Sequence, residues 1–393
     1  MDMTLKTQAE KKYLRDWLRR LPPRWLFRLF AWFGFKPAPM KALIDASAFM
    51  LPQWMYTAIK LDIPELLLQR PRSARELAEE LSLSADRLVR LLYALEQHGY
   101  FKRVGRRKTN HDGNQLDGVW EHTALSAVLS EKHPNTIRAI VLHWIEDCYA
   151  PSGTLLHAIK ADGCAFRLHH EGQFKGFFED YLSTFPEQSR QFSNAMSATS
   201  AFTDEAVLRD FPWSRYEHVI DVGGSNGSFL ELLLERCPKM KGTIFDLEEV
   251  IVGARTVWSE KPSQLASRVT LEAGSFFDVN TIPKLPESSA FVLRNILHDW
   301  SDDECLSILS NLRQAMPSEK STLVLIELGL GFDANGHVLE QARSTIDMLM
   351  MTMFDGRERT RTHFENLFKQ TGFELKSITS TRSVAHVIEA TPI

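Results

Sequence analysis

The stretch HVIDVGGSNGSFLELLLERC, residues 218–237, decides the fold of this chain of 393 residues. Its apolar first part predicts a strand, the run SFLELLLERC predicts a helix, and a Gly-rich turn joins the two. Glycine permits a tight turn and lets a ligand approach the backbone. The stretch therefore predicts a strand–turn–helix unit with a ligand-binding turn at the carboxyl end of the strand.

Strand-like runs continue to the end of the chain, each bounded by helical or turn segments. Four of them follow the first unit, as GTIFDL (242–247), VTLEAG (269–274), AFVLRNIL (290–297) and STLVLIEL (321–328). The last two, GFELKSITS and VAHVIEA, are separated by a short turn and suit a hairpin. Alternating strands and helices with an antiparallel finish predict an α/β domain with a mostly parallel, doubly wound sheet over residues 211–393.

The region before this sheet predicts a small helical domain with a wing. Ser73 and Glu76 have the spacing of a capping box at the start of a helix, and Ser84 suits the cap of a second helix. A two-stranded wing with a polar tip is predicted after that helix. Residues 41–125 therefore predict a winged-helix domain, and residues 126–210 predict a mostly helical connecting region.

A winged helix suggests DNA binding, and this wing carries basic residues that could contact phosphates. These residues are Lys102, Arg103, Arg106, Arg107 and Lys108. The second helix, however, is expected to use its leucines for packing and to turn only Arg87 and Arg90 outward near its start. We favour a platform for packing and dimerisation, and a DNA-binding regulator is the alternative.

Residues 1–40 are predicted to form a basic amphipathic arm. They hold nine Lys or Arg against three Asp or Glu, a balance of +6, which leaves −10 for the rest because the whole chain carries −4. Basic residues run through its apolar part and no stretch reaches the roughly 20 apolar residues of a transmembrane helix, so neither a secretory signal nor a membrane span is expected. An arm packed on a partner subunit or on its own domain is favoured, and a weak contact with a membrane surface stays open.

Composition limits the class of protein. Hydrophobic residues make up 44% and charged residues 24%, which excludes a collagen, a disordered chain and a multi-span membrane protein. The four Cys are far apart and form no CxxC pair, so structural zinc and a disulfide framework are not expected and a cytoplasmic location fits. His169 and His170 lack a third ligand at a useful spacing, so no metal site is predicted.

The Gly-rich turn favours one class of cofactor. After Gly223, the dinucleotide fingerprint GxGxxG would need glycine at positions 225 and 228, and both are Ser. The turn has two adjacent glycines instead, and Asp246 lies 19 residues after Gly227, where an acid binds ribose hydroxyls. This pattern suits S-adenosylmethionine, which has no pyrophosphate, better than NAD.

Several short motifs in a fixed order carry a family resemblance. They are DVGGSNGSF from 221, FDL from 245, GSFF from 274, LRNILHDWSDDEC from 293, and FDGRERT from 354 with FENLFKQTGF from 364. In this set the chain resembles the S-adenosylmethionine-dependent small-molecule O-methyltransferases of the caffeic-acid and acetylserotonin types and their bacterial natural-product relatives. The resemblance covers residues 41–393 and implies a Rossmann-like class I methyltransferase sheet, a winged-helix dimerisation domain and a homodimer.

The resemblance implies cofactor-binding roles for five residues. It places Gly223 at the methionine part of the cofactor, Asp246 at the ribose hydroxyls, and Ser275 and Phe276 beside the adenine. Arg294 stands where the family often has Lys, and Ser275 where it usually has Asp. A serine still bonds an adenine nitrogen but brings no charge to that edge of the site.

His298 is the predicted general base. It follows the strand AFVLRNIL at the ligand-binding edge of the sheet, and an unperturbed imidazole near pH 7 is neutral enough to accept a proton. The resemblance gives His298 this role and matches Glu327 and Glu358 to acids that flank and orient it, with a surface ion pair as the alternative for Glu358. It also implies that the helix IDMLMMTMFDG lines the acceptor pocket. The predicted substrate-binding residues are Met350, Met351 and Phe354.

Together these features predict an enzyme of secondary metabolism. It is expected to move a methyl group from S-adenosylmethionine to a hydroxyl of a phenolic or polycyclic aromatic molecule, without a metal and without nucleic acid. Two alternatives stay open. One is a methyltransferase-like enzyme with other chemistry, such as hydroxylation or decarboxylation, and the other is the DNA-binding regulator.

Overall fold

The computed structural model describes residues 37–104, 118–286, 288–332 and 337–393. Most of the predicted basic arm and the tip of the predicted wing lie outside the described residues. The chain divides into two compact units, residues 1–145 and 146–393. Within the described ranges, no helix is long and apolar enough to cross a membrane.

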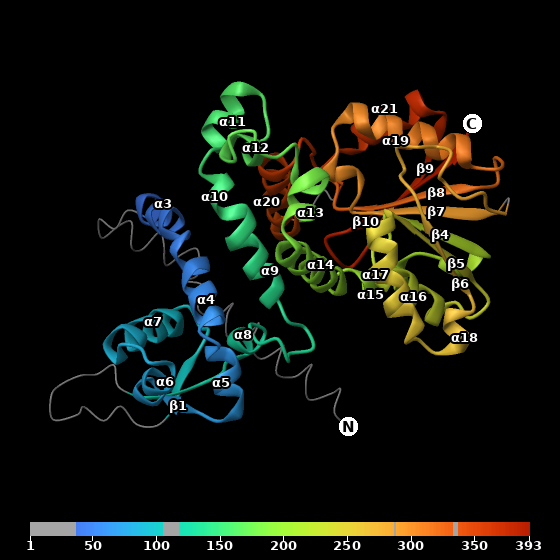
Figure 1. Cartoon of the computed structure of the whole chain (residues 1–393). Helices are drawn as coiled ribbons and strands as arrows, with labels where there is room; N and C mark the ends of the chain where they lie inside the picture. The colour runs from blue at the N-terminus through green and yellow to red at the C-terminus, as the bar shows by residue number, and fades with distance from the viewer. Residues whose placement is uncertain (1–36, 105–117, 287, 333–336) are drawn as a thin grey trace, which may run out of the picture. The chain divides into compact units, whose positions relative to one another are not determined.

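The first unit is a helical domain with a small antiparallel sheet, coloured blue to teal in Figure 1. Its elements are α3 (Pro37–Ser47), α4 (Met50–Lys60), α5 (Ile63–Gln69), β1 (Arg72–Ser73), α6 (Ala74–Leu81), α7 (Ala85–Gln97), β2 (Lys102–Val104), β3 (Val119–Glu121), α8 (Ala124–Ala127) and α9 (Arg138–His143). Ser73 forms the predicted capping box with Glu76, and Ser84 accepts the backbone N–H of Arg87. Both predicted helix starts and the two-stranded wing of β2 and β3 are confirmed.

The second helix of this unit, α7, faces the core with its leucines, as predicted. The buried ones are Leu88, Leu92 and Leu95. In the described part of the wing, Lys102 lies 2.7 Å from Glu121 and Arg103 lies 2.9 Å from Glu96. Because these two cations are paired with acids of their own domain, they are poorly placed to neutralise phosphates. The other basic residues of the wing lie outside the described residues.

The second unit begins with short helices that lead into the sheet. They are η1 (Trp144–Cys148), α10 (Tyr149–Ser152), α11 (Leu155–Ala161), α12 (Ala165–His169), η2 (Phe177–Tyr181), α13 (Leu182–Thr184), α14 (Pro186–Ala201), α15 (Asp204–Asp210) and η3 (Trp213–Arg215). Aromatic rings hold several of them together, and His170 packs among them, with its ring centroid 4.5 Å from that of Phe166 and 5.2 Å from that of Phe174. His170 is therefore part of a packed aromatic cluster.

The sheet of the second unit has seven strands in the order β6-β5-β4-β7-β8-β10-β9. The strands are β4 (His218–Val222), β5 (Lys241–Asp246), β6 (Val269–Ala273), β7 (Ser289–Arg294), β8 (Thr322–Glu327), β9 (Phe373–Ser380) and β10 (His386–Pro392). The first five in this order are parallel, and β10 runs antiparallel to both β8 and β9. The predicted mostly parallel sheet with an antiparallel finish is confirmed.

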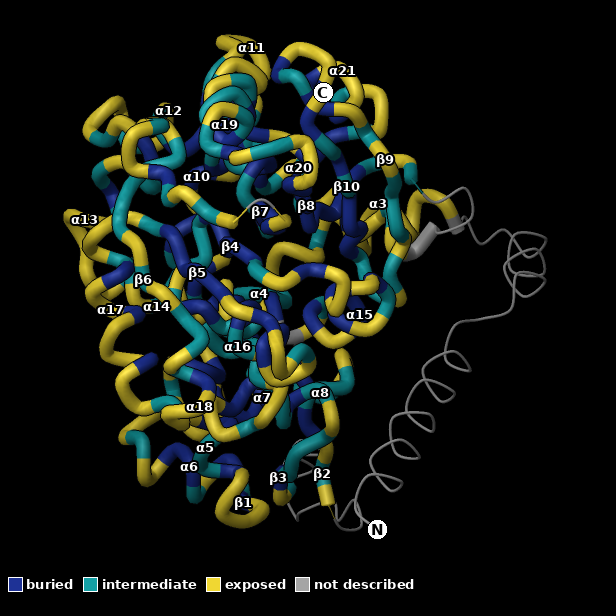
Figure 2. Tube along the Cα trace, turned by 90° about the vertical axis from the view of Figure 1, so that its right-hand side faces the viewer, coloured by how far each residue is buried: buried dark blue, intermediate teal, exposed yellow. Residues whose placement is uncertain are grey.

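Helices cover both faces of this sheet (Figure 1). They are α16 (Ser228–Arg236), α17 (Glu248–Ser259), α18 (Ser263–Ala266), α19 (Asp302–Ala315) and α21 (Arg361–Thr371), whereas α20 (His337–Met353) packs against α10 and α12. Successive side chains of a strand point to opposite faces, so Val219 packs with α16 and α17 whereas Ile220 packs with α19 and α21. Two apolar layers thus bury the central strands, which are dark blue in Figure 2.

Candidate active site

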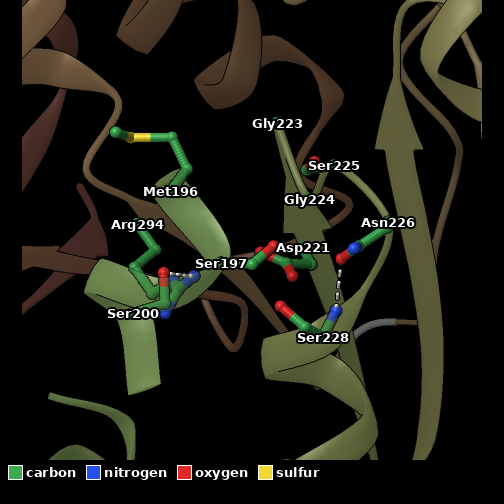
Figure 3. Close-up of a pocket in the computed structure, with 10 residues that line it drawn as sticks. All are labelled: Met196, Ser197, Ser200, Asp221, Gly223, Gly224, Ser225, Asn226, Ser228 and Arg294. Carbon is green, nitrogen blue, oxygen red and sulfur yellow. Dashed lines mark hydrogen bonds between the residues drawn. The ribbon is translucent and has the colours of Figure 1, made fainter. Parts of the chain in front are cut away.

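Three predicted site residues lie where neighbouring parallel strands end. Gly223 follows β4, Arg294 ends β7 and Glu327 ends β8. The pairing of β4 with β7 and of β7 with β8 brings these ends to one edge of the sheet. A cavity opens there, and Figure 3 shows its lining by Asp221, the Gly-rich turn, three residues of α14 and Arg294. This edge is where open α/β sheets bind ligands.

The Gly-rich turn keeps its backbone open to the cavity. Gly223 has φ +72, and a Cβ there would lie 2.5 Å from Cδ1 of Ile296. Gly227 has φ +79, and its Cβ would lie 2.1 Å from Cδ1 of Ile244. Both positions therefore need glycine for two reasons, the left-handed backbone and the lack of space.

Asp246, at the end of β5, ties the second strand to this turn. Its carboxylate accepts the backbone N–H of Ser225 at 2.8 Å and that of Leu247 at 2.7 Å. Burial raises its pKa, and these two backbone hydrogen bonds act in the opposite direction. A carboxylate has about four acceptor positions, so Asp246 keeps capacity for ligand hydroxyls.

Asp221, the acidic residue two positions before the first glycine of the turn, forms part of the cavity wall. It is 3% exposed, and its side chain receives no hydrogen bond from the residues that the structure describes. Burial raises the pKa of its carboxyl to about 7, although the charge of Arg294 lowers it. A buried carboxylate without a partner is costly, so Asp221 is suited to receive a cationic group of a ligand.

Arg294 lines the cavity and is held on its far side. Its guanidinium forms an ion pair with Asp204 of α15 and donates to Oγ of Ser200 at 2.6 Å. Burial raises the pKa of Asp204, while Arg294 lowers it. Nothing in the sequence pattern pointed to Asp204 or Ser200, because they come from helices about ninety residues earlier in the chain.

Ser275 and Phe276 lie in the loop after β6 and are not among the residues that line this cavity. Oγ of Ser275 accepts the backbone N–H of Phe277 at 3.2 Å. The ring of Phe276 comes within 3.9 Å of the position that a Cβ of Gly223 would occupy. Phe276 is therefore close to the Gly-rich turn, and Ser275 is half-buried beside it.

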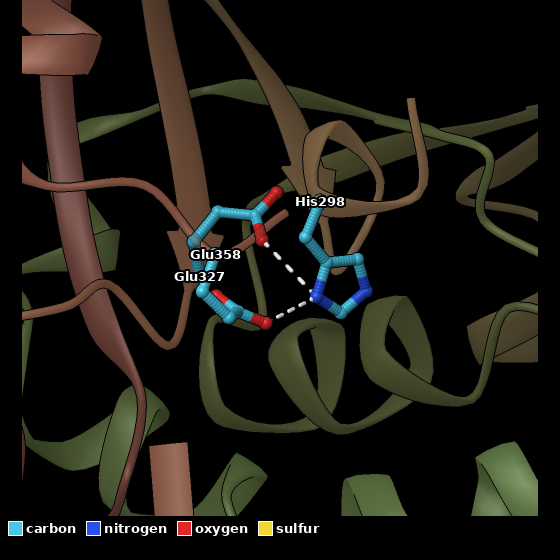
Figure 4. Close-up of side chains that lie close together, drawn as sticks. All are labelled: His298, Glu327 and Glu358. Atoms are coloured by element: carbon cyan, nitrogen blue, oxygen red, sulfur yellow. Dashed lines mark hydrogen bonds and ion pairs between the residues drawn. The ribbon is translucent and has the colours of Figure 1, made fainter. Parts of the chain in front are cut away.

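His298 lies in the short turn η4 (Leu297–Asp299), directly before α19, and meets both predicted acids. Its Nδ1 is 2.7 Å from Oε1 of Glu358 and 3.8 Å from Oε2 of Glu327, as Figure 4 shows. Nε2 is on the other side of the ring, 3.6 Å from Oδ1 of Asp299. Glu358 is 3% exposed, so the alternative of a surface ion pair does not hold.

Several charges set the protonation of this histidine. Burial lowers its pKa, but the carboxylates of Asp299, Glu358 and Glu327 together raise it to about 10. Burial raises the pKa of Glu327 to about 7, with His298 acting in the opposite direction. The imidazole is thus favoured as a cation stabilised by buried acids, and its neutral form becomes abundant only as the pH rises.

The turn that carries His298 is fixed by groups on two other segments of the chain. Oε1 of Glu327 accepts the backbone N–H of Leu297 at 3.0 Å. Arg359, only 1% exposed, donates to the carbonyls of Leu297 and Trp300 and to the carboxylate of Asp302. A Cβ on Gly356 would lie 1.9 Å from the carbonyl oxygen of His298, so this glycine allows the closest approach. The segment 354–360 therefore supports the backbone of the histidine as well as its imidazole.

Arg359 should act as a positioning residue. An Arg359→Lys variant loses the planar fork that reaches two carbonyls and a carboxylate at once, so we expect kcat to fall about 10–100-fold with little change in cofactor affinity. Steady-state kinetics combined with titration calorimetry of S-adenosylmethionine measures this split. The matched control is Arg361→Lys, because Arg361 is exposed and its one ion pair within the described residues is with Glu365. An unchanged kcat in Arg359→Lys would show that the turn that carries His298 keeps its geometry without the guanidinium.

His298, Glu327 and Glu358 also place three potential metal-ligand atoms within 4.8 Å of one another. The separation of 2.7 Å between Nδ1 and Oε1 of Glu358 is a hydrogen-bond distance. Two ligand atoms about 2 Å from one tetrahedral zinc ion would lie farther apart than that. The geometry as it stands therefore fits an oriented histidine better than a metal centre.

A second cavity lies beside the same turn and contains aromatic rings. The rings of Phe178 and Phe354 are parallel within 3°, with centroids 5.0 Å apart, and Trp300 lies 6.4 Å from Phe178. These three rings, Met353 and Asp299 are among its lining residues. Of the predicted substrate-binding residues, Phe354 lines this cavity, whereas Met350 is buried and Met351 half-buried on α20. The neighbouring Met353, which is also buried, lines the cavity, and the substrate-binding roles of Met350 and Met351 stay predictions.

Comparisons with known proteins match two parts of the chain. A family model described as an O-methyltransferase domain matches residues 157–374, and one described as an O-methyltransferase dimerisation domain matches residues 45–132. A flavonoid 7-O-methyltransferase of Mentha piperita is 29% identical over 341 residues, which are 86% of this chain and 92% of that protein. The phenazine O-methyltransferase PhzM of Lysobacter antibioticus is 27% identical over 365 residues, 92% of this chain and 98% of that protein.

Solved structures of similar fold cover nearly the whole chain. LaPhzM aligns with a TM-score of 0.79 at 27% identity, over 91% of this chain and 100% of that one. Human N-acetylserotonin methyltransferase in complex with S-adenosylmethionine aligns with a TM-score of 0.77 at 22% identity, over 91% of this chain and 98% of that one. At this identity the second match speaks for the fold alone.

Proposed function

We propose that this chain, which belongs to the S-adenosylmethionine-dependent O-methyltransferase family, methylates a hydroxyl of an aromatic small molecule with His298 as general base. One observation carries the proposal. The imidazole of His298 stands at the ligand-binding edge of the sheet with Nδ1 2.7 Å from Glu358, while Nε2 lies on the other side of the ring. An imidazole held in this way can take a proton at Nε2 and be stabilised at Nδ1.

Residues that line the first cavity, together with neighbours outside its lining, fit S-adenosylmethionine. The unpartnered carboxylate of Asp221 would receive its ammonium group, Gly223 leaves room at the backbone, and Asp246 would accept from the ribose hydroxyls. Phe276 would lie against the adenine, with Ser275 at the edge of that base. Arg294, which is held by its ion pair with Asp204, would form part of the cavity wall. When bound, S-adenosylmethionine supplies an electrophilic methyl group. The chain's own residues then have to bind the acceptor, orient it and remove its proton.

Proton removal is assigned to Nε2 of His298. As the acceptor oxygen becomes more nucleophilic, its proton moves to Nε2, and the imidazolium that forms donates from Nδ1 to Glu358. Glu327 holds the turn and adds a second carboxylate to the same side of the ring. The rest of the rate enhancement comes from the positioning of the acceptor and from the exclusion of water by the aromatic rings around it.

The second cavity is the proposed acceptor site. It adjoins His298 through Asp299 and Trp300, and its parallel rings suit a flat aromatic molecule. The relatives are named for flavonoids and phenazines, which are also aromatic ring systems. An aromatic acceptor, phenolic or polycyclic, follows from both observations.

The remaining expectations stay part of the proposal. The match to a dimerisation domain supports a homodimer built on the winged-helix region, with residues 126–210 as connector and residues 211–393 as catalytic domain. Four free cysteines, three of them buried, fit a reducing cytoplasm. The assembled base with its oriented acid also disfavours hydroxylation and decarboxylation, which would not need it.

Gly223→Ala should weaken cofactor binding. The new methyl group would collide with Ile296 and strain the left-handed backbone, so we expect the dissociation constant for S-adenosylmethionine to rise about tenfold or more, measured by calorimetry. Gly172→Ala is the matched control, because Gly172 also has φ +72 but has nothing within 4 Å of its Cβ position. Equal affinities in the two variants would contradict this placement of the cofactor.

The experiment that tests the function is a screen of phenolic and polycyclic acceptors with isotope-labelled S-adenosylmethionine, read by mass spectrometry. A product that gains one labelled methyl group supports the proposal, in the presence and in the absence of a chelator. Loss of activity on chelation would indicate instead that His298, Glu327 and Glu358 hold a metal ion. A product that gains oxygen or loses carbon dioxide would replace methyl transfer by the alternative chemistry.

A further inference from the structure

The second cavity carries an unbalanced charge. Its lining contains one cation, Arg167, and four acids, so the formal sum at neutral pH is +1 − 4 = −3. The four acids are Glu179, Asp299, Glu304 and Asp355. The other lining residues are apolar or aromatic apart from one glycine, so no other group offsets these charges within the lining.

Both terminal nitrogens of the Arg167 guanidinium are already engaged by one carboxylate. Its Nη2 donates to Oδ1 of Asp355 at 2.8 Å, and its Nη1 lies 2.6 Å from Oδ2 of the same carboxylate. This bidentate pair satisfies both groups and cancels one of the four negative charges. An anionic ligand would have to displace Asp355 before it could use the guanidinium.

While His298 is in the neutral form that accepts a proton, two of the remaining acids face the cavity without a neutralising partner, whereas the protonated imidazole offsets the charge of Asp299. Glu304 is used by the capping box of α19, where it accepts from Ser301. Glu179, which is exposed, forms no ion pair within the described residues, and Asp299 lies 3.6 Å from Nε2 of His298. Glu179 therefore stands at the solvent side of the cavity and Asp299 beside the reacting end.

We infer that this cavity selects its acceptor by charge, taking neutral or cationic hydroxylated arenes and disfavouring those that carry a carboxylate. The inference rests on the proposed function of the cavity as acceptor site. A carboxylate placed among Glu179, Asp299 and the Arg167–Asp355 pair would meet like charge beside the aromatic rings of the lining. Like charges brought together at an interface weaken binding of the acceptor, which acts directly on kcat/KM.

The test compares acceptors that share one aromatic ring system and differ in one substituent that sets the charge. Two sets serve: 6-hydroxy-2-naphthoate with its primary amide and the aminomethyl analogue, and 3-(3,4-dihydroxyphenyl)propionate with its amide and the propylamine. We expect kcat/KM for the amide and the amine to exceed that for the carboxylate by at least about tenfold. Added salt should narrow the gap, because Asp355 is 42% exposed and the mouth is open to ions.

Variants identify the residues responsible. Glu179→Gln should raise the carboxylate-to-amide ratio of kcat/KM about threefold to tenfold, and Asp355→Asn should raise it further because it also frees Arg167. Glu272→Gln, an exposed acid on the edge strand β6, is the control that leaves the ratio unchanged. Unfolding temperatures of all variants are recorded to exclude a change in folding.

The outcomes separate the two proposals. If the carboxylates are methylated as well as the amides, or if Arg167→Gln abolishes turnover of the carboxylates alone, then Arg167 anchors anions and the charge inference is overturned. If no compound is methylated, the proposed function fails, and dissociation constants of the same compounds in the presence of S-adenosylhomocysteine then decide the charge question. Tighter binding of the carboxylates in that experiment would equally overturn it.

Discussion

Replacing His298 by Ala is expected to lower kcat for methyl transfer about 10²–10⁴-fold, the usual scale of a lost general base. The variant removes the imidazole that both predicted acids contact, and it leaves the first cavity untouched because His298 does not line it. Cofactor affinity should therefore stay within about threefold of the original, by the additivity expected of separate sites. The rate loss is read from labelled methyl incorporation at saturating cofactor.

The exposed His157 on α11 provides the control for this variant. A His157→Ala protein should methylate at the original rate and thereby show that the preparation tolerates loss of a histidine. If His298→Ala binds the cofactor and transfers methyl at the original rate, deprotonation does not depend on His298. The acceptor would then have to ionise without help from the protein.

Glu358→Gln is expected to lower the rate by a similar factor, roughly 10²–10⁴-fold, for a different reason. The carboxylate of Glu358 can only accept a hydrogen bond, so it keeps the imidazole proton on Nδ1. Nε2 is then free to take the proton of the acceptor hydroxyl. An amide at the same place can donate to Nδ1 instead, which would put the imidazole proton on Nε2, where it blocks the base. Loss of one negative charge also lowers the pKa of His298 from about 10.

The pH dependence separates this explanation from simple damage. Only neutral His298 accepts a proton, so kcat/KM should rise with pH towards the pKa of about 10, and in Glu358→Gln the rise should occur at lower pH. Glu327→Gln is the matched comparison, because Glu327 lies 3.8 Å from Nδ1 and an amide oxygen there can still accept from Leu297. Its effect should be at least about tenfold smaller. Equal losses in the two variants, or a pH limb that does not move, would contradict the assigned roles.

Much of the sheet domain could be predicted from the sequence because its strands and turns are local signals. A buried parallel strand is a short apolar run, and the Gly-rich turn after β4 has φ values that few residues other than glycine adopt. The capping box of Ser301 and Glu304 is likewise readable within one turn of chain. The order of strands in the sheet was not readable from local pattern, since it depends on pairing between distant segments.

The residues of the candidate site also divide into those that the sequence indicated and those that only the structure showed. His298 and Glu358 are 60 residues apart, and only the family resemblance brought them together before the structure did. Asp221 was visible beside the glycines but only burial without a partner gives it a role. Arg359 and Asp204 had no signal, because a buried guanidinium that serves backbone carbonyls has the same sequence appearance as a surface one. Helix rotation decides which methionines of α20 meet the cavity, and the sequence alone does not indicate that Met353 is among them.

The central claim is tested most directly by one measurement, a single-turnover reaction of the enzyme with labelled S-adenosylmethionine and an aromatic hydroxyl acceptor, analysed by mass spectrometry for the original protein and for His298→Ala. We predict a product with one labelled methyl group on the hydroxyl oxygen, formed at least about 10²-fold more slowly by the variant, although both proteins bind the cofactor. A product without the labelled methyl group, or equal rates for the two proteins, would contradict the account.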